Sequence, residues 1–184
     1  MIKRYYIDAL NKRLPYTKFI DYMVAHSDAF SVVYFKYHDS ERTKKSTREM
    51  KKQLEPYKLF SCNVDKWPGT ETKNEFGHIY RLAVYRCDEA VADILKTVDH
   101  LYAWNYPAFP MDLAFYRDGY AWFSSCAHEW LMWFYTNDAL AVEALTAQGL
   151  SVEEDGEKDI EKMFLLPAAA AKKLDISGRK GGKV

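Results

Sequence analysis

Residues 113–136, LAFYRDGYAWFSSCAHEWLMWFYT, decide the predicted fold because three short apolar runs follow one another here. The first two runs, 113–117 and 120–126, flank Asp118-Gly119, a pair that favours the positive φ angles of a two-residue type I′ hairpin. The third run, 130–136, is able to return antiparallel to the second. We therefore predict a β-meander over about 113–136.

Helical and strand-like periods alternate in the rest of the chain. Apolar residues at i, i+3, i+4 and i+7 from Tyr16 predict an amphipathic helix, and Asp88 is a suitable N-cap for another. Further strands are expected at 5–7, 30–37, 58–63 and 78–86, and further helices at 40–54, at 138–149 and in the alanine-rich C-terminal stretch.

This pattern predicts a single α+β domain over residues 1–175, with a mainly antiparallel sheet and helices packed on one face. A doubly wound α/β fold is the alternative. It is disfavoured because no glycine-rich phosphate-binding turn follows a predicted strand.

The composition excludes several classes of function. The chain has 184 residues, 26 basic and 26 acidic, and therefore no net field that would coat nucleic acid or an anionic membrane. The mean hydropathy is −0.40, and no apolar run approaches the roughly 20 residues that cross a bilayer. Residues 1–10 contain no apolar signal-peptide core, so we expect a cytoplasmic protein without a membrane segment.

Charge gathers in three local segments: a lysine-rich helical face at 44–52, an acidic stretch at 153–159, and a basic, glycine-rich tail at 176–184 that we expect to be flexible. No nucleic-acid-binding motif accompanies the basic segments, and the acidic stretch lacks the order of a calcium loop. We therefore expect solvated faces and no nucleic-acid partner.

Cysteine and histidine are scattered. Cys62, Cys87 and Cys126 form no CxxC pair, and no two of the five histidines have the spacing of ligands on one helix face. We expect no disulfide framework, no metal site and no cofactor.

One short segment, 124–129, contains nucleophile, base and carboxylate types together. Cys126, His128 and Glu129 are the weak catalytic candidates. On a continuous strand, residues i and i+2 lie about 7 Å apart with parallel side chains, which disfavours a direct hydrogen bond. The alternative interpretation is that Cys126 packs as a small residue in a sheet, while His128 and Glu129 lie in the turn between two strands.

Aromatic residues in loops are the candidates for partner or ligand binding: Trp67 in the turn 65–71, and Trp104, Tyr106 and Phe109 in the proline-broken loop 104–110. Tryptophan is frequent at interaction hot spots. The alternative for each ring is inward packing, with Trp67 as a loop anchor and the rings of 104–110 as a seal at the edge of the core.

Three motifs carry a resemblance to a known family. Trp67-Pro68-Gly69-Thr70, the run 112–119 (DLAFYRDG) and Ala127-His128-Glu129 resemble segments of small bacterial proteins that often carry the label "stage III sporulation protein AH". The similarity spans most of residues 1–155. It implies a soluble, largely uncharacterised family without established catalytic residues.

Two classes of function follow. The first is a non-catalytic domain that binds another protein, as an immunity protein covers a toxin or a regulator covers its target; it is favoured by the missing catalytic motif and the aromatic loops. The second is a small enzyme or small-ligand binder, with a pocket formed by residues 104–110 and 124–129. The second class requires these two segments to converge on a cleft.

Overall fold

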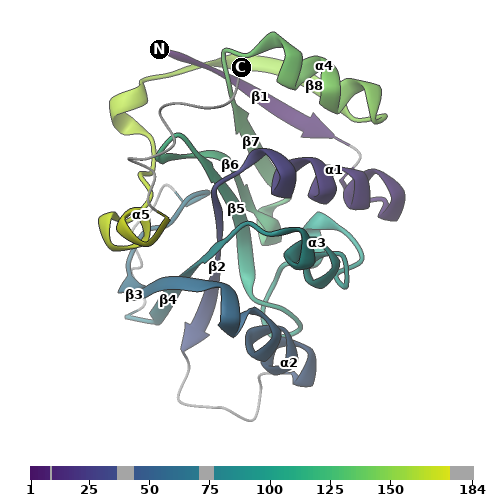
Figure 1. Ribbon diagram of the computed structural model, residues 1–184. Coiled ribbons are helices and arrows are strands. Elements are labelled where there is room, and N and C mark those ends of the chain that lie inside the picture. The colour runs from purple at the N-terminus through teal and green to yellow at the C-terminus, as the bar shows by residue number, and fades with distance from the viewer. Residues whose placement is uncertain (9, 37–43, 71–76, 175–184) are drawn as a thin grey trace.

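A computed structural model describes residues 1–8, 10–36, 44–70 and 77–174. Eight strands form one antiparallel sheet in the order β3-β4-β2-β5-β6-β7-β1-β8 (Figure 1). The strands are β1 (Ile2–Asp8), β2 (Ala29–Lys36), β3 (Lys58–Val64), β4 (Ile79–Arg86), β5 (Met111–Arg117), β6 (Tyr120–Cys126), β7 (Leu131–Tyr135) and β8 (Ser151–Lys158). The predicted α+β class with a mainly antiparallel sheet is confirmed.

The predicted meander forms the centre of this sheet as β5, β6 and β7. Asp118 and Gly119 have φ angles of 54° and 87°, as a type I′ turn requires. A register shift between Phe115 and Tyr116 leaves one extra residue on β6. This bulge lets the neighbouring Trp122 and Phe123 both pack into the same core cluster.

Three helices cover one face of the sheet: α1 (Arg13–His26), α2 (Lys45–Leu54) and α3 (Glu89–Leu95). The apolar face predicted from Tyr16 is buried, and the Asp88 side chain caps α3 by accepting a hydrogen bond from the Ala90 N–H. Alternate residues of β2, such as Phe30 and Val32, point into this main core. None of the described helices is long and apolar enough to cross a membrane.

The opposite face has a smaller cover. The helix α5 (Ala168–Leu174) and the loop that contains Trp67 pack there, against a cluster that includes Ala29 and Val33 of β2 (Figure 1). The helices α1 to α3 lie on one face as expected, and α5 adds a layer that the sequence pattern did not predict. The remaining helix, α4 (Ala139–Ala147), packs beside the edge strand β8 and contributes Ala141 and Leu145 to the main core.

The acidic stretch forms a strand that the sequence did not predict. β8 pairs with β1 from Ile2↔Lys158 to Asp8↔Ser151, and its side chains are mostly exposed. Backbone pairing along one edge of a sheet requires no apolar side chains, which is why hydrophobic periodicity misses this strand. The predicted tail at 176–184 and residues 40–43 of a predicted helix lie outside the described residues.

Candidate functional site

Three segments that are distant in sequence meet at one end of the sheet, around the carboxylate of Asp112. This side chain is 1% exposed at the start of β5. Its Oδ2 accepts a hydrogen bond from the Trp67 indole N–H at 2.7 Å, and its Oδ1 accepts one from the Ala127 backbone N–H at 2.9 Å. Asp112 therefore ties the loop after β3 to the turn after β6.

Local backbone geometry places these groups. Asp112 has a φ of 52° and lies where the pairing of β5 with β2 shifts register, between Ser31 and Val33. Such bulges redirect a side chain, and a positive φ at a residue other than glycine costs about 1–3 kcal/mol. Gly69 has a φ of 96° and lies so close to the Ser125 carbonyl that a Cβ atom would be 2.1 Å from its oxygen. Glycine is therefore required for the loop to approach β6.

Cys126, His128 and Glu129 form a second part of the same site. The strand β6 ends at Cys126, and the 3-10 turn η3 (Ala127–Glu129) folds the chain back. The Cys126 Sγ atom consequently lies 3.6 Å from His128 Nδ1, and His128 Nε2 lies 3.6 Å from Glu129 Oε1. The turn agrees with the packing interpretation of this segment, but the short distance between thiol and imidazole does not follow from strand geometry.

Burial decides the charge state of this site. Burial raises the pKa of Asp112, and the hydrogen bonds from Ala127 and Trp67 partly oppose the shift. Burial also raises the pKa of the Cys126 thiol to about 12, with a further contribution from the negative charge of Asp112. Cys126 is 4% exposed. A thiol with this pKa carries very little thiolate at neutral pH and is not an activated nucleophile.

One group of the described residues has the atoms to hold a metal ion: Asp112, Cys126 and His128. One ligand atom of each lies within 4.8 Å of the others, and His128 opens to solvent with its side chain 48% exposed. Sequence spacing gave no sign of this set because Asp112 comes from another strand. One signal was present: an acidic residue beside the apolar run 113–116 of a predicted strand.

The sequence candidates in aromatic loops are mostly buried. Trp67 is 6% exposed and anchors its loop on Asp112. Trp104 is fully buried, and its indole N–H donates to the Tyr16 hydroxyl at 2.8 Å. Phe109 is half-buried against the main core, and the half-buried Tyr106 packs edge-on against Phe35. The inward-packing alternative therefore describes Trp67 and Trp104, which leave almost no ring surface for a partner.

The two segments of the predicted pocket do adjoin. The Asp112 N–H donates to the Trp104 carbonyl at 3.3 Å, while its carboxylate accepts from Ala127. Two of the surface hollows formed by the described residues are lined by other segments than 104–110. One lies between α1 and α3, with Asp21, Glu89 and Lys96 among its lining residues. The other, which is very small, lies beside Gly69 and Ser124.

No known protein family, curated protein or solved structure matches the chain. The resemblance to the sporulation-labelled proteins therefore stays a prediction. The motifs that suggested it occupy one place in the fold: Trp67 and Ala127 bind the two oxygens of Asp112, and Gly69 packs on Ser125.

Trp130 is a candidate binding residue that the sequence did not single out. It follows η3 in the left-handed conformation, with a φ of 61°, and is 59% exposed. Its ring stacks on Tyr102, with centroids 4.5 Å apart and an interplanar angle of 24°. Tyr102 is itself largely buried and hydrogen-bonded to Tyr6. The sequence placed Trp130 at the start of a strand, where nothing indicates an exposed ring.

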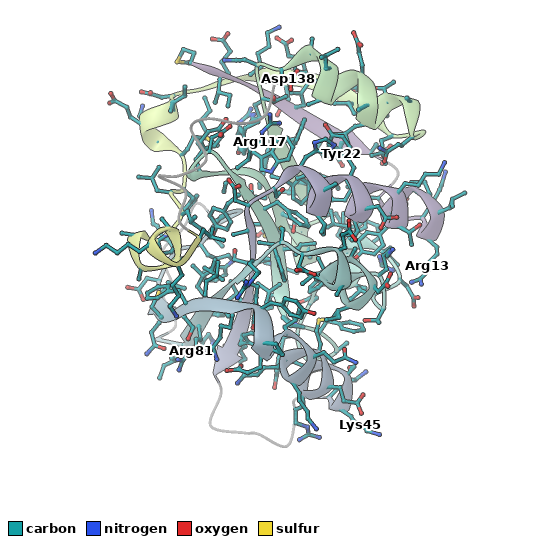
Figure 2. The ribbon with its side chains drawn as sticks, in the orientation of Figure 1. Arg13, Tyr22, Lys45, Arg81, Arg117 and Asp138 are labelled. Carbon is teal, nitrogen blue, oxygen red and sulfur yellow. The ribbon has the colours of Figure 1, made fainter. Side chains whose placement is uncertain are left out.

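The basic face predicted at 44–52 lies on α2, where Lys45, Arg48, Lys51 and Lys52 are exposed. Figure 2 shows Lys45 at the far end of the molecule from Arg117 and Asp138. Arg117 Nη1 lies 3.9 Å from Asp138 Oδ2. Figure 1 places α2 and β8 at opposite ends of the molecule, so the positive charge on α2 and the negative charge on β8 are separated within the described residues, in agreement with solvated local patches.

Proposed function

We propose that the protein is a non-catalytic protein-binding domain, regulatory or immunity-like, whose contact surface is centred on Trp130. The single observation that carries this proposal is the exposure of that ring. Trp67, Trp104 and Trp122 are at most 6% exposed, whereas Trp130 is 59% exposed. A tryptophan that could bury its ring but presents it to solvent is the side chain most enriched at interaction hot spots.

The way in which Trp130 is held supports binding. Its backbone N–H donates to the Ala127 carbonyl at 3.3 Å, and its ring rests on the nearly buried Tyr102. The first contact fixes the backbone at Trp130, and the second restricts the ring before a partner arrives. A restricted aromatic ring loses little conformational entropy on binding, so more of the contact energy contributes to affinity.

The neighbours of Trp130 define the chemistry of the partner. Leu131 is 37% exposed and extends the apolar surface, while the Glu129 carboxylate is 59% exposed. A cationic side chain is able to lie over the indole face and reach Glu129. The partner is therefore a protein surface that offers an apolar contact next to an arginine or lysine.

Substitution of Trp130 tests the proposal. The purified chain is used to capture partners from extracts of its native host, and the dissociation constant of any stoichiometric partner is then measured by calorimetry. Trp130→Ala should weaken that complex by about 2 kcal/mol, about 30-fold in Kd. Leu140→Ala is the matched control, because Leu140 is 72% exposed on α4. Absence of a stoichiometric protein partner, or unchanged affinity of Trp130→Ala, refutes the proposal.

A small enzyme is the second candidate function, favoured by the distances from Cys126 to His128 and from His128 to Glu129. Nucleophile, base and orienting carboxylate follow this order in cysteine-dependent catalysis. The raised pKa of the thiol ranks this function second. Replacing Cys126 and His128 by alanine tests it: a folded double variant that retains any activity found for the chain excludes the pair from catalysis.

We also propose a cytoplasmic location. The three cysteines Cys62, Cys87 and Cys126 are all free thiols, which supports a reducing compartment. A fusion to a fluorescent protein in the native host, followed by fractionation, tests this location.

A further inference from the structure

We propose that Asp112, Cys126 and His128 bind one divalent transition-metal ion, and that Zn²⁺ is the ion this ligand set favours. The proposal departs from the expectation of no metal site, which rested on spacing along the sequence alone. It does not depend on the protein-binding function proposed for Trp130.

The first argument is distance. Zinc bonds of about 2.3 Å to sulfur and about 2.0–2.1 Å to nitrogen, at a tetrahedral angle, place the two ligand atoms about 3.6 Å apart. Cys126 Sγ and His128 Nδ1 are separated by 3.6 Å. All three ligand atoms lie within 4.8 Å of one another, whereas a tetrahedral site needs about 3.4–3.6 Å between an oxygen and its neighbours. A small movement of the Asp112 carboxylate therefore completes the set.

The second argument is the arrangement around the ligands. A histidine that binds metal through one nitrogen almost always donates its other ring N–H to a carboxylate, a backbone carbonyl or water. His128 Nε2 lies 3.6 Å from Glu129 Oε1, an ion-pair contact that a small rotation of the exposed Glu129 side chain would shorten to a hydrogen bond. Asp112 is fixed in the same way by the N–H groups of Trp67 and Ala127. Each oxygen keeps a further lone pair, because a carboxylate accepts about four hydrogen bonds.

The third argument is charge. The hydrogen-bond partners of the buried Asp112 carboxylate are two neutral N–H groups. When a divalent ion binds, the Cys126 thiol releases one proton to solvent and the S–metal bond forms. The thiolate and the carboxylate then carry two negative charges, which the ion balances, and a histidine ligand binds as the neutral imidazole.

Ligand type and access select the ion. Sulfur with imidazole and carboxylate suits Zn²⁺ and Co²⁺, and disfavours Mg²⁺ and Ca²⁺, which prefer oxygen alone. The half-exposed His128 provides the route from solvent to two ligands that are almost fully buried. Three protein ligands leave a fourth position for water or for an atom of another molecule.

Cobalt titration of the full chain tests the proposal. The chain is freed of metal by a chelator, and Co²⁺ is added while the thiolate-to-cobalt charge-transfer absorption is recorded. We expect saturation at one equivalent and displacement by Zn²⁺. Cys126→Ser should abolish the band, while Cys62→Ser, the same chemical change in β3, should leave it unchanged. No band in the unaltered chain, or a band that persists in Cys126→Ser, overturns the proposal.

Two further variants cover the case in which Cys126→Ser fails to fold. The side chains of His128 and Glu129 are 48% and 59% exposed, so His128→Asn and Glu129→Gln should keep the fold, as circular dichroism would show. Glu129→Gln should weaken Co²⁺ binding about 10–100-fold, and His128→Asn more than that. Trp130→Ala should bind Co²⁺ as the unaltered chain does. Equal affinity of His128→Asn and the unaltered chain overturns the proposal.

Discussion

Replacing Gly69 by alanine should destabilise the protein far more than the same change at Gly156. Both glycines have a positive φ, 96° at Gly69 and 101° at Gly156. An alanine at Gly156 meets nothing within 4 Å, whereas at Gly69 its Cβ lies 2.1 Å from the Ser125 oxygen. The pair of variants therefore separates the conformational cost from the cost of the collision.

The magnitude follows from these contacts. A positive φ costs an alanine about 1–2 kcal/mol, which is the whole effect expected at Gly156. At Gly69 the loop must also retreat by about 1.3 Å to reach ordinary contact at 3.4 Å. Such a shift breaks the 2.7 Å hydrogen bond from Trp67 to Asp112, and a bond to a charged group contributes about 1.5–3 kcal/mol. We therefore expect Gly69→Ala to lose about 2.5–5 kcal/mol.

Urea unfolding followed by circular dichroism measures both variants. The urea concentration at the unfolding midpoint should fall further for Gly69→Ala than for Gly156→Ala. The slope of unfolding free energy against urea concentration should be the same for both, because both variants expose similar surface on unfolding. For a chain of this length, about 1 kcal/mol corresponds to about 2–4 °C in Tm. If Gly69→Ala loses no more stability than Gly156→Ala, the close approach of the loop to β6 is wrong.

Three further results are expected. Trp67→Phe removes a donor to the Asp112 carboxylate and should lower the free energy of unfolding in urea by about 1.5–3 kcal/mol. Trp122→Phe should lower it by about 0.5–1.5 kcal/mol, because the Trp122 indole donates to a neutral hydroxyl. Equal losses would contradict a buried carboxylate. Cys126 should react slowly with an alkylating reagent in the metal-free protein at pH 8, as measured by mass spectrometry. Its pKa is raised from 9.0 to about 12, so the thiolate fraction falls. We expect a rate on the order of 10³-fold below that of an ordinary thiol. The rate should rise about tenfold per pH unit, and a rate at pH 8 equal to that of the unfolded chain would refute the assignment. Trp130→Ala should change the free energy of unfolding by less than about 1 kcal/mol, because the ring is mostly exposed. A larger loss in the same urea assay would show that Trp130 is a packing residue.

The parts of the fold that local chemistry determines could be predicted. Asp118-Gly119 specifies its turn through backbone preference alone, and Asp88 caps its helix with its own side chain. The strand at 151–158 was missed because its stability comes from backbone pairing with β1, which side-chain hydrophobicity does not report. The place of α5 on the second face was also missed, because it depends on packing against residues of β2 and β3 that are distant in sequence.

The candidate site was predictable only in part, since its members come from three segments. Cys126, His128 and Glu129 attracted attention by residue type, but strand spacing placed the Cα atoms of Cys126 and His128 about 7 Å apart, with parallel side chains. The turn after Cys126 ends the strand, and the two side chains approach until Sγ lies 3.6 Å from Nδ1. Asp112 was missed because no local pattern predicts that an acidic side chain at a strand start will be buried against Trp67 and Ala127.

The position of β1 constrains the order in which this protein is able to fold. β1 lies between β7 and β8, and its nearest pairing in sequence, Tyr5 with Phe134, joins residues 129 positions apart. During synthesis, β1 therefore lacks its partner strands β7 and β8 until most of the chain has left the ribosome. The hairpin of β5 and β6 closes over two residues and is free to form first. Completion of the sheet is consequently a late event, which depends on a long-range closure at its acidic edge.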